Sequence, residues 1–207
     1  MTGVYANCAL TITDHAGLSS EPVVLPNFVW SDELMDFCNL PAFDTTNTIS
    51  KNECLSLVSL YVSTDGDHRT NNTNRLETTD VEQRFGVRTG EYEGERHVDG
   101  LFLHKSSGLD IHGAGDTRQG NNLVGTLADV FDDLPFLRDI NFSRNTLVGN
   151  LPASLGSLQD LIHLFIVESG LTGEIPTSFA ALDSLQILHL KGNHLDGALP
   201  DWLGDMV

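Results

Sequence analysis

The chain has 207 residues, of which 40% are hydrophobic, and this is enough to bury a core in one domain or two small ones. Its 29 acidic and 11 basic residues give a formal net charge of −18, which repels phosphate backbones and anionic lipid surfaces, so nucleic acid is not an expected partner. No apolar run approaches the roughly 20 residues that span a bilayer, and residues 1–20 show neither the basic start nor the apolar core of a signal peptide, so we expect no membrane insertion by this chain.

Residues 1–49 contain no repeat and are rich in Asp, Asn, Thr and Pro. We expect this segment to be a partly ordered leader. The three cysteines, Cys8, Cys38 and Cys54, all lie before residue 55. An odd count allows at most one internal disulfide and leaves one thiol over, and the sequence does not say which pair forms.

A helix is predicted to begin after Ser50. Ser50 and Glu53 stand three residues apart, which is the spacing of a capping box, in which each side chain binds the other's backbone N–H. An apolar stripe follows at Leu57, Val58, Leu60 and Tyr61. The helix should end at STDGD, because Asp65 and Gly66 are typical turn residues.

The second half of the chain repeats itself. NNLVGTLA at residues 121–128 returns as NTLVGNLP, SGLTGEIP and NHLDGALP, and the glycines Gly125, Gly149, Gly173 and Gly197 are each 24 residues apart. A fixed period of this length is typical of a solenoid. Seven apolar columns keep the same step, which independent drift would not preserve. They begin at Leu123, Leu127, Phe131, Leu134, Leu137, Ile140 and Phe142.

Each repeat can be divided into a strand and a turn. Apolar and polar residues alternate around Leu164 and Ile166, which predicts a half-buried strand, and we expect parallel strands near 138–144, 162–168 and 186–192. Asn121, Asn145 and Asn193, replaced in one repeat by Ser169, should bind backbone groups of the turn. The glycine that follows permits a backbone conformation that a side chain would block. The proline after it is expected to stop helix or strand formation on the outer side.

The repeat LxxLxLxxNxLxGxIPxxL, seen at residues 185–203, resembles the plant-type leucine-rich repeat. The resemblance implies an α/β repeat fold, a right-handed leucine-rich-repeat solenoid with a small helical N-terminal cap. It places the cap at residues 50–97 and the repeats at residues 98–207. In family caps a helix is followed by a Trp-containing loop and CxWxGVxC. Arg69, Arg75 and Arg84 stand here where tryptophans are common, and Glu82 and Thr89 where the paired cysteines would be.

The first repeat strand is expected within HVDGLFLH, with Val98, Leu101 and Leu103 aligned to Leu137, Ile140 and Phe142. From Leu103 to Asn121 there are 18 residues, whereas Phe142 and Asn145 are 3 apart. Residues 104–120 are therefore predicted to be a surface insertion. A solvated loop is the preferred interpretation of this insertion, and a functional loop is the alternative.

No motif in the sequence predicts catalysis. GAGDTRQG lacks the third glycine of a dinucleotide-binding loop, where Arg118 lies, and the lysine of a phosphate-binding loop. The histidines and aspartates around residues 97–116 do not have the spacing of a tight metal site. We therefore expect a protein that is not an enzyme and binds no cofactor and no metal.

The candidate binding site is the concave face of the solenoid. If Leu164 and Ile166 point into the core, the alternate strand positions point outward. Phe165 between histidines suits the centre of an interface, although isolated apolar residues are also common on surfaces. The outward positions form three rows: Asp139, His163, Ile187; Asn141, Phe165, His189; and Ser143, Val167, Lys191.

The predicted function is a non-enzymatic recognition module that binds a protein, peptide or glycan through this face. The alternative is the sensing fragment of a longer receptor-like kinase whose catalytic domain is not in this chain. Ice binding needs a regular threonine ladder, and the column Thr126, Asn150, Glu174, Ala198 is not one.

The resemblance suggests the cell surface or the extracellular space. The strand near 186–192 is expected to expose Leu188 and Leu190, so the chain should continue with further repeats or self-associate through this C-terminal edge.

Overall fold

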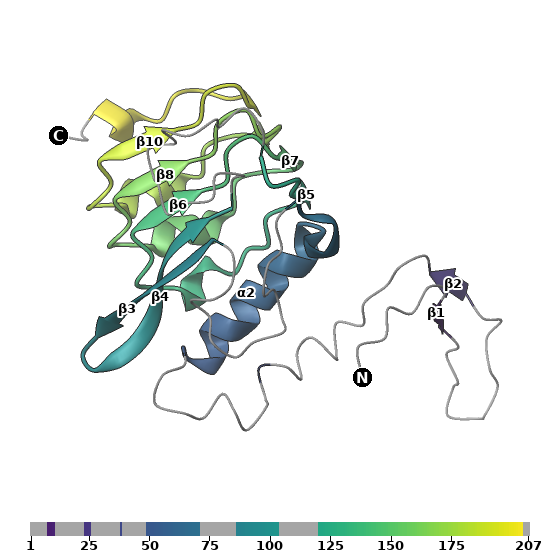
Figure 1. Ribbon diagram of the computed structural model, residues 1–207. Helices are drawn as coiled ribbons and strands as arrows, with labels where there is room; N and C mark the ends of the chain where they lie inside the picture. The colour runs from purple at the N-terminus through teal and green to yellow at the C-terminus, as the bar shows by residue number, and fades with distance from the viewer. Residues whose placement is uncertain are drawn as a thin grey trace, which may run out of the picture.

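The computed structural model describes residues 8–10, 23–25, 38, 49–70, 86–103 and 120–204. Its centre is a five-stranded sheet in the order β10-β8-β6-β4-β3. These strands are β3 (Val87–Tyr92), β4 (Glu95–Phe102), β6 (Asp139–Asn141), β8 (His163–Phe165) and β10 (Ile187–His189). They lie one above another in Figure 1, with the helix α2 (Lys51–Ser63) beside them. The predicted stack of parallel strands is confirmed.

The register of the sheet follows the 24-residue period. Ile140 pairs with Leu164, and Leu164 pairs with Leu188. Leu101 pairs with Ile140, as the alignment of the first strand predicted. The three repeat strands are shorter than expected, at three residues each. Backbone hydrogen bonds between the coils continue beyond the strand ends, from Arg144 N to Val167 O at 2.7 Å and from Glu168 N to Lys191 O at 2.8 Å.

The apolar columns form one continuous core between the sheet and the outer side of the coils. Phe142, Leu164 and Ile166 are fully enclosed, as are Leu134 and Leu158 on the opposite wall. Burying a Leu, Ile or Phe side chain stabilises a fold by about 1.5–3 kcal/mol, so each coil adds several such contributions. The last members of the columns are less covered: Leu188 and Leu190 are half-buried, and Leu199 is 81% exposed.

Asparagine side chains bind backbone groups at the turns, as predicted, and they also join one coil to the preceding one. Asn193 Oδ1 accepts from the N–H groups of Ser169 (3.1 Å) and Leu171 (3.2 Å). Its Nδ2 donates to the carbonyls of Ile166 (2.5 Å) and Leu190 (2.8 Å). Buried backbone groups need such partners, so one side chain satisfies four of them. Ser169 takes over part of this role in its repeat, where its Oγ donates to the Phe142 carbonyl at 3.0 Å.

A second flank of short strands follows the asparagines, which the sequence did not predict. The strands β5 (Val124–Gly125) and β7 (Thr146–Leu147) pair in parallel, as do β9 (Thr172–Gly173) and β11 (His194–Leu195). The four repeat glycines have φ between 74° and 117°, a region that favours glycine. Their predicted role is confirmed.

Short 3-10 helices cover the outer side: η4 (Phe131–Asp133), η5 (Ala153–Ser157), η6 (Thr177–Ala181) and η7 (Asp201–Gly204). The prediction that proline stops helix formation here was wrong. Pro152 and Pro176 are the N-cap residues of η5 and η6, with φ of −60° and −58°. Proline's fixed φ suits the start of a helix, where no N–H partner is needed.

The cap helix begins as predicted. Ser50 Oγ accepts from Glu53 N at 3.2 Å, and Ser50 N donates to Glu53 Oε2 at 3.0 Å. Glu53 is 1% exposed, and its Oε1 also accepts from Val98 N at 2.9 Å. The capping box therefore joins the helix to β4. The helix ends at Ser63, in the predicted turn, and is followed by the short 3-10 helix η2 (Gly66–His68).

A disulfide joins Cys38 to Cys54, across 16 residues of chain. The structure thus selects one of the pairs that the sequence left open. Cys54 lies on α2 and both cysteines are buried. The cap is disulfide-bonded without the CxWxGVxC cysteines, which Glu82 and Thr89 replace.

Arg69 stands where family caps commonly have tryptophan, and it lies beside Tyr61 and Thr64. Its guanidinium carbon lies 5.0 Å from the centre of the Tyr61 ring, and its Nη2 donates to Thr64 Oγ1 at 2.7 Å. Burial lowers the pKa of Arg69 to about 10. The cap therefore packs around an arginine at this position.

The predictions for Arg75 and Arg84, for the insertion at residues 104–119 and for most of the leader concern residues outside the described ranges. Within the leader, β1 (Cys8–Leu10) pairs antiparallel with β2 (Val23–Leu25).

Candidate ligand-binding face

The outward side chains of the sheet form lateral rows that continue beyond those predicted. Register places Arg88 and Gly100 in the row of Asp139, His163 and Ile187. The next row contains Phe102, Asn141, Phe165 and His189. Ser143, Val167 and Lys191 follow the strands. The nine predicted residues thus lie on one face, and Arg88, Gly100 and Phe102 were missed.

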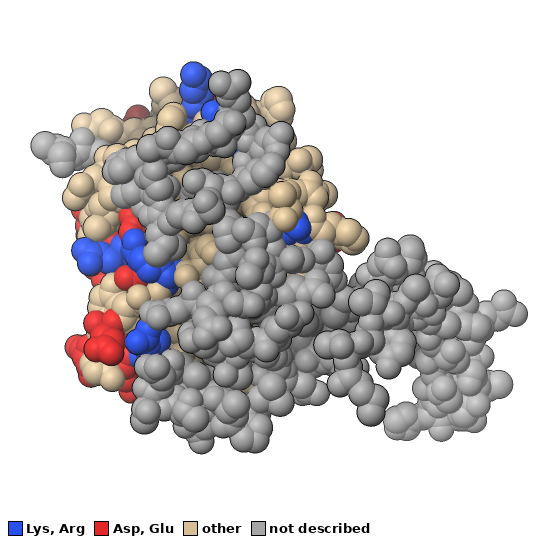
Figure 2. Space-filling view, in the orientation of Figure 1, with Lys and Arg blue, Asp and Glu red and all other residues tan. Residues whose placement is uncertain are grey.

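Arg88 was missed because β3 was not predicted, whereas Gly100 and Phe102 lie on the predicted first strand and were left out of the rows. The strands β3 and β4 form an antiparallel hairpin whose two turn residues, Glu93 and Gly94, have φ of 54° and 87°. Two positive φ angles are typical of the two-residue turns that join hairpin strands. The signal was the Glu-Gly pair between VRTGEY and ERHVDGLF. Figure 2 shows acidic side chains gathered near the end of this hairpin, where Glu91, Glu93 and Glu95 are exposed.

Burial falls from the cap toward the C-terminal coils. Phe102 is 1% exposed and Asn141 is 5% exposed, although both belong to the outward rows. Phe165 and Ile187 are half-buried, and His189 and Lys191 are exposed. The predicted residues Asp139 and Asn141 are therefore enclosed, and the accessible part of the face lies on β8 and β10.

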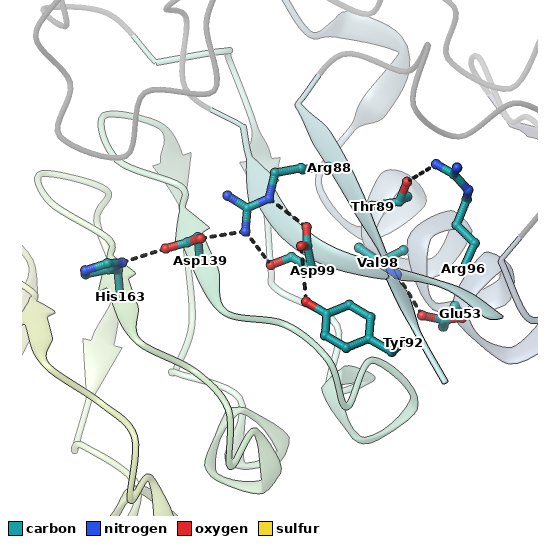
Figure 3. Close-up of polar contacts among 9 residues, drawn as sticks. All are labelled: Glu53, Arg88, Thr89, Tyr92, Arg96, Val98, Asp99, Asp139 and His163. Atoms are coloured by element: carbon teal, nitrogen blue, oxygen red, sulfur yellow. Dashed lines mark hydrogen bonds and ion pairs between the residues drawn. The ribbon is translucent and has the colours of Figure 1, made fainter. Parts of the chain in front are cut away.

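A chain of polar contacts crosses the enclosed part (Figure 3). Arg88 Nε donates to Asp99 Oδ1 at 2.7 Å, and Arg88 Nη2 donates to Asp139 Oδ2 at 2.6 Å. Asp139 Oδ1 lies 2.6 Å from His163 Nδ1. Tyr92 donates its hydroxyl to Asp99 Oδ2 at 3.3 Å. Burial alone would lower the pKa of the Arg88 guanidinium, but hydrogen bonds and charge attraction from Asp99 and Asp139 outweigh it and raise the pKa.

Two backbone features make this chain of contacts possible. Arg88 pairs with Gly100 and Thr89 with Val98, so Asp99 is the extra residue of a β-bulge. A bulge turns a side chain away from its regular direction, and here Asp99 reaches the same face as Arg88. Gly100 leaves room for the guanidinium to cross β4, since a Cβ there would lie 3.2 Å from Arg88 Cζ and 2.6 Å from the Phe102 ring.

The accessible part is built around Phe165. Its ring centre lies 6.3 Å from that of His163 and 6.0 Å from that of His189. Asp139 Oδ1 fixes the ring of His163 through its 2.6 Å contact with Nδ1, and Ser143 Oγ accepts a hydrogen bond from Val167 N at 3.1 Å. Phe165 thus has fixed neighbours on both sides and stays partly open to solvent. Such an aromatic suits the centre of a recognition surface.

Among the described residues no group of three or more His, Cys, Asp or Glu side chains could hold a metal ion. The same part of the chain contains no helix that is long and apolar enough to cross a membrane.

Comparison with known proteins identifies the repeats. The Leucine Rich Repeat family matches residues 184–206. The LRR ectodomain of the receptor kinase SOBIR1 from Arabidopsis thaliana superposes with a TM-score of 0.58 at 22% identity, covering 77% of this chain and 76% of that one. The chain therefore has the leucine-rich-repeat fold, and its residues 184–206 match the family's repeat. A search of curated proteins found no match.

Two further leucine-rich-repeat structures agree in fold. The BIR3–SERK2 complex from Arabidopsis thaliana matches with a TM-score of 0.56 at 23% identity, over 73% of this chain and 74% of that one. The ectodomain of GASSHO1/SCHENGEN3 from Arabidopsis thaliana gives a TM-score of 0.60 at 26% identity. The match covers 75% of this chain but 17% of that one. The leucine-rich-repeat solenoid predicted from the 24-residue period is thereby confirmed.

Proposed function

We propose that this leucine-rich-repeat module binds a protein or peptide ligand through the part of its concave face around Phe165. The observation that carries the proposal is a partly open aromatic ring held between His163 and His189, on a sheet whose register fixes all three. Fixed aromatic groups contribute strongly to binding because little side-chain freedom is lost.

The relatives support a binding role. The GASSHO1/SCHENGEN3 ectodomain was solved in complex with CASPARIAN STRIP INTEGRITY FACTOR 2, and BIR3 was solved in complex with SERK2. A protein or peptide partner therefore fits this chain better than a glycan, because Phe102 is buried and Phe165 is the accessible phenyl ring of the described rows. Binding without catalysis agrees with the lack of catalytic motifs in the sequence.

The test is the double variant Phe165→Ala with His189→Ala. Neither side chain lies in the core, which Leu164 and Ile166 form, so the fold should persist. Capture of a partner from extracts, followed by titration, should show affinity reduced by about tenfold or more. Leu199→Ala, at an exposed apolar residue elsewhere, is the matched control. Unchanged affinity of the double variant would move the site away from Phe165.

Two wider proposals go with this function. The neighbours are ectodomains of receptor kinases, which favours the sensing part of a longer receptor-like kinase as the second candidate, and the gene sequence flanking residues 1 and 207 tests it. Self-association through the edge of β10 stays a prediction, and light scattering of the 207-residue chain tests it.

A further inference from the structure

The accessible part of the concave face has a definite chemical character. Its outward positions contain three apolar residues, two histidines and one lysine, and no carboxylate. They are His163, Phe165, Val167, Ile187, His189 and Lys191. This composition is unusual in a chain with a net charge of −18.

Two carboxylates at the border of this patch are paired with arginines. Asp139 contacts Arg88 at 2.6 Å and also lies 2.6 Å from His163 Nδ1. Glu168, which follows β8, lies 3.6 Å from Arg144 Nε. A paired carboxylate contributes little local field, so neither residue gives the patch a negative character.

The two basic side chains of β10 and of the turn that follows it differ from those carboxylates in their ion pairing. Lys191 and His189 are exposed, and within the described part of the chain neither forms an ion pair. They stand two residues apart, which in an extended chain corresponds to roughly 7 Å along one face. Phe165 lies beside His189 in register, and Val167 lies in the row of Lys191.

We propose that this patch takes a peptide segment in which a carboxylate stands next to an apolar side chain. The inference rests on the proposed function and specifies its ligand class. The apolar group packs on Phe165 and Val167, the carboxylate meets Lys191, and His189 donates a hydrogen bond. The overall negative charge does not prevent this, because the Debye length is about 8 Å at physiological salt and the nearest charges dominate.

The probes are three matched libraries of displayed short peptides. All contain Leu, Phe, Gly and Ser, and they differ in carrying Asp and Glu, Lys and Arg, or Asn and Gln. The full chain is the target, and the best peptide of each library is then titrated by fluorescence anisotropy. Lys191→Glu is the test variant, and Lys51→Glu makes the same change at an exposed residue on α2. Circular dichroism confirms that both variants fold.

The acidic library should give the tightest peptide. Lys191→Glu should weaken its binding by about tenfold, Lys51→Glu should leave it within about twofold, and salt near 1 M, where the Debye length falls to about 3 Å, should weaken it as well. A basic or amide peptide that binds best and is lost in Phe165→Ala with His189→Ala would overturn this inference while the proposed function stands. No enrichment from any library would overturn this inference and leave a folded protein as the ligand of the proposed function. Peptide binding that is unchanged in the double variant would overturn both.

Discussion

In this solenoid, a single asparagine in a coil provides hydrogen-bond partners for several buried backbone N–H and C=O groups. Asn145 Nδ2 donates to the carbonyls of Leu103 (3.0 Å) and Phe142 (2.8 Å), and its Oδ1 accepts from Leu123 N at 3.0 Å. These groups are buried, where an unpaired N–H or C=O costs about 1–3 kcal/mol. The side chain therefore joins its own coil to the preceding one. Ser169 shows that a shorter side chain can take over only part of this role.

Asn145→Ala should lower the free energy of unfolding by about 2–4 kcal/mol, because it leaves several buried backbone groups without partners. Asn145→Ser should cost less, since Ser169 serves in the next coil. Urea denaturation measures both. Asn150→Ala is the matched control, because Asn150 is exposed, and it should stay within about 0.5 kcal/mol of the parent. Equal losses for Asn145→Ala and Asn150→Ala would contradict this account of the coil.

At the scale of elements, the repeats predicted the central parallel strands, whereas the second flank of short strands and the β3–β4 hairpin were missed. The 24-residue period predicted the stack of strands, its register and the outward rows, because each repeat provides another instance of the same pattern. The capping box gave the start of α2. The hairpin was missed because β3 occurs only once in the chain. Its sequence, VRTGEY, also lacks the alternation of apolar and polar residues that distinguishes a strand from a loop. The bulge at Asp99 could not be read, because it depends on the pairing of two strands.

Gly100 is the residue on which the contact between hairpin and repeats depends. In Gly100→Ala the new Cβ would meet the Phe102 ring and the Arg88 guanidinium, so Arg88 should be displaced from Asp139. We expect a loss of about 1–3 kcal/mol of stability, as for other overpacked sites. The same variant should weaken ligand binding, because Asp139 would no longer fix His163. Denaturant unfolding and peptide titration measure the two effects.

Gly204→Ala serves as the control for this prediction, since a Cβ there meets nothing within 4 Å. Arg88→Ala should reproduce the binding defect of Gly100→Ala without the steric contact with Phe102. If Gly100→Ala is as stable as the parent and binds as well, the crossing of Arg88 over β4 does not hold the site together.

For the whole molecule, one covalent bond joins the leader to the cap. Cys38 lies in a segment predicted as leader, yet it is bonded to Cys54 on α2. Cys38 and Ile49 therefore belong to the same core as Cys54, although both precede the predicted start of the cap at residue 50. The sequence could not place this boundary, because three cysteines allow three pairings and no spacing rule selects among them.

The double variant Cys38→Ser with Cys54→Ser should lose about 3 kcal/mol of unfolding free energy, the entropy expected when a loop of roughly 15 residues is no longer closed in the unfolded chain. Cys8→Ser makes the same chemical change outside the disulfide and should have a much smaller effect.

Since two of the three cysteines are bonded, thiol titration of the denatured, unreduced protein should count one thiol, and three after reduction. Three thiols before reduction, or equal losses in the two variants, would show that the bond does not hold leader and cap together. The loss should also appear in the parent protein when a reductant is added, because reduction opens the same loop.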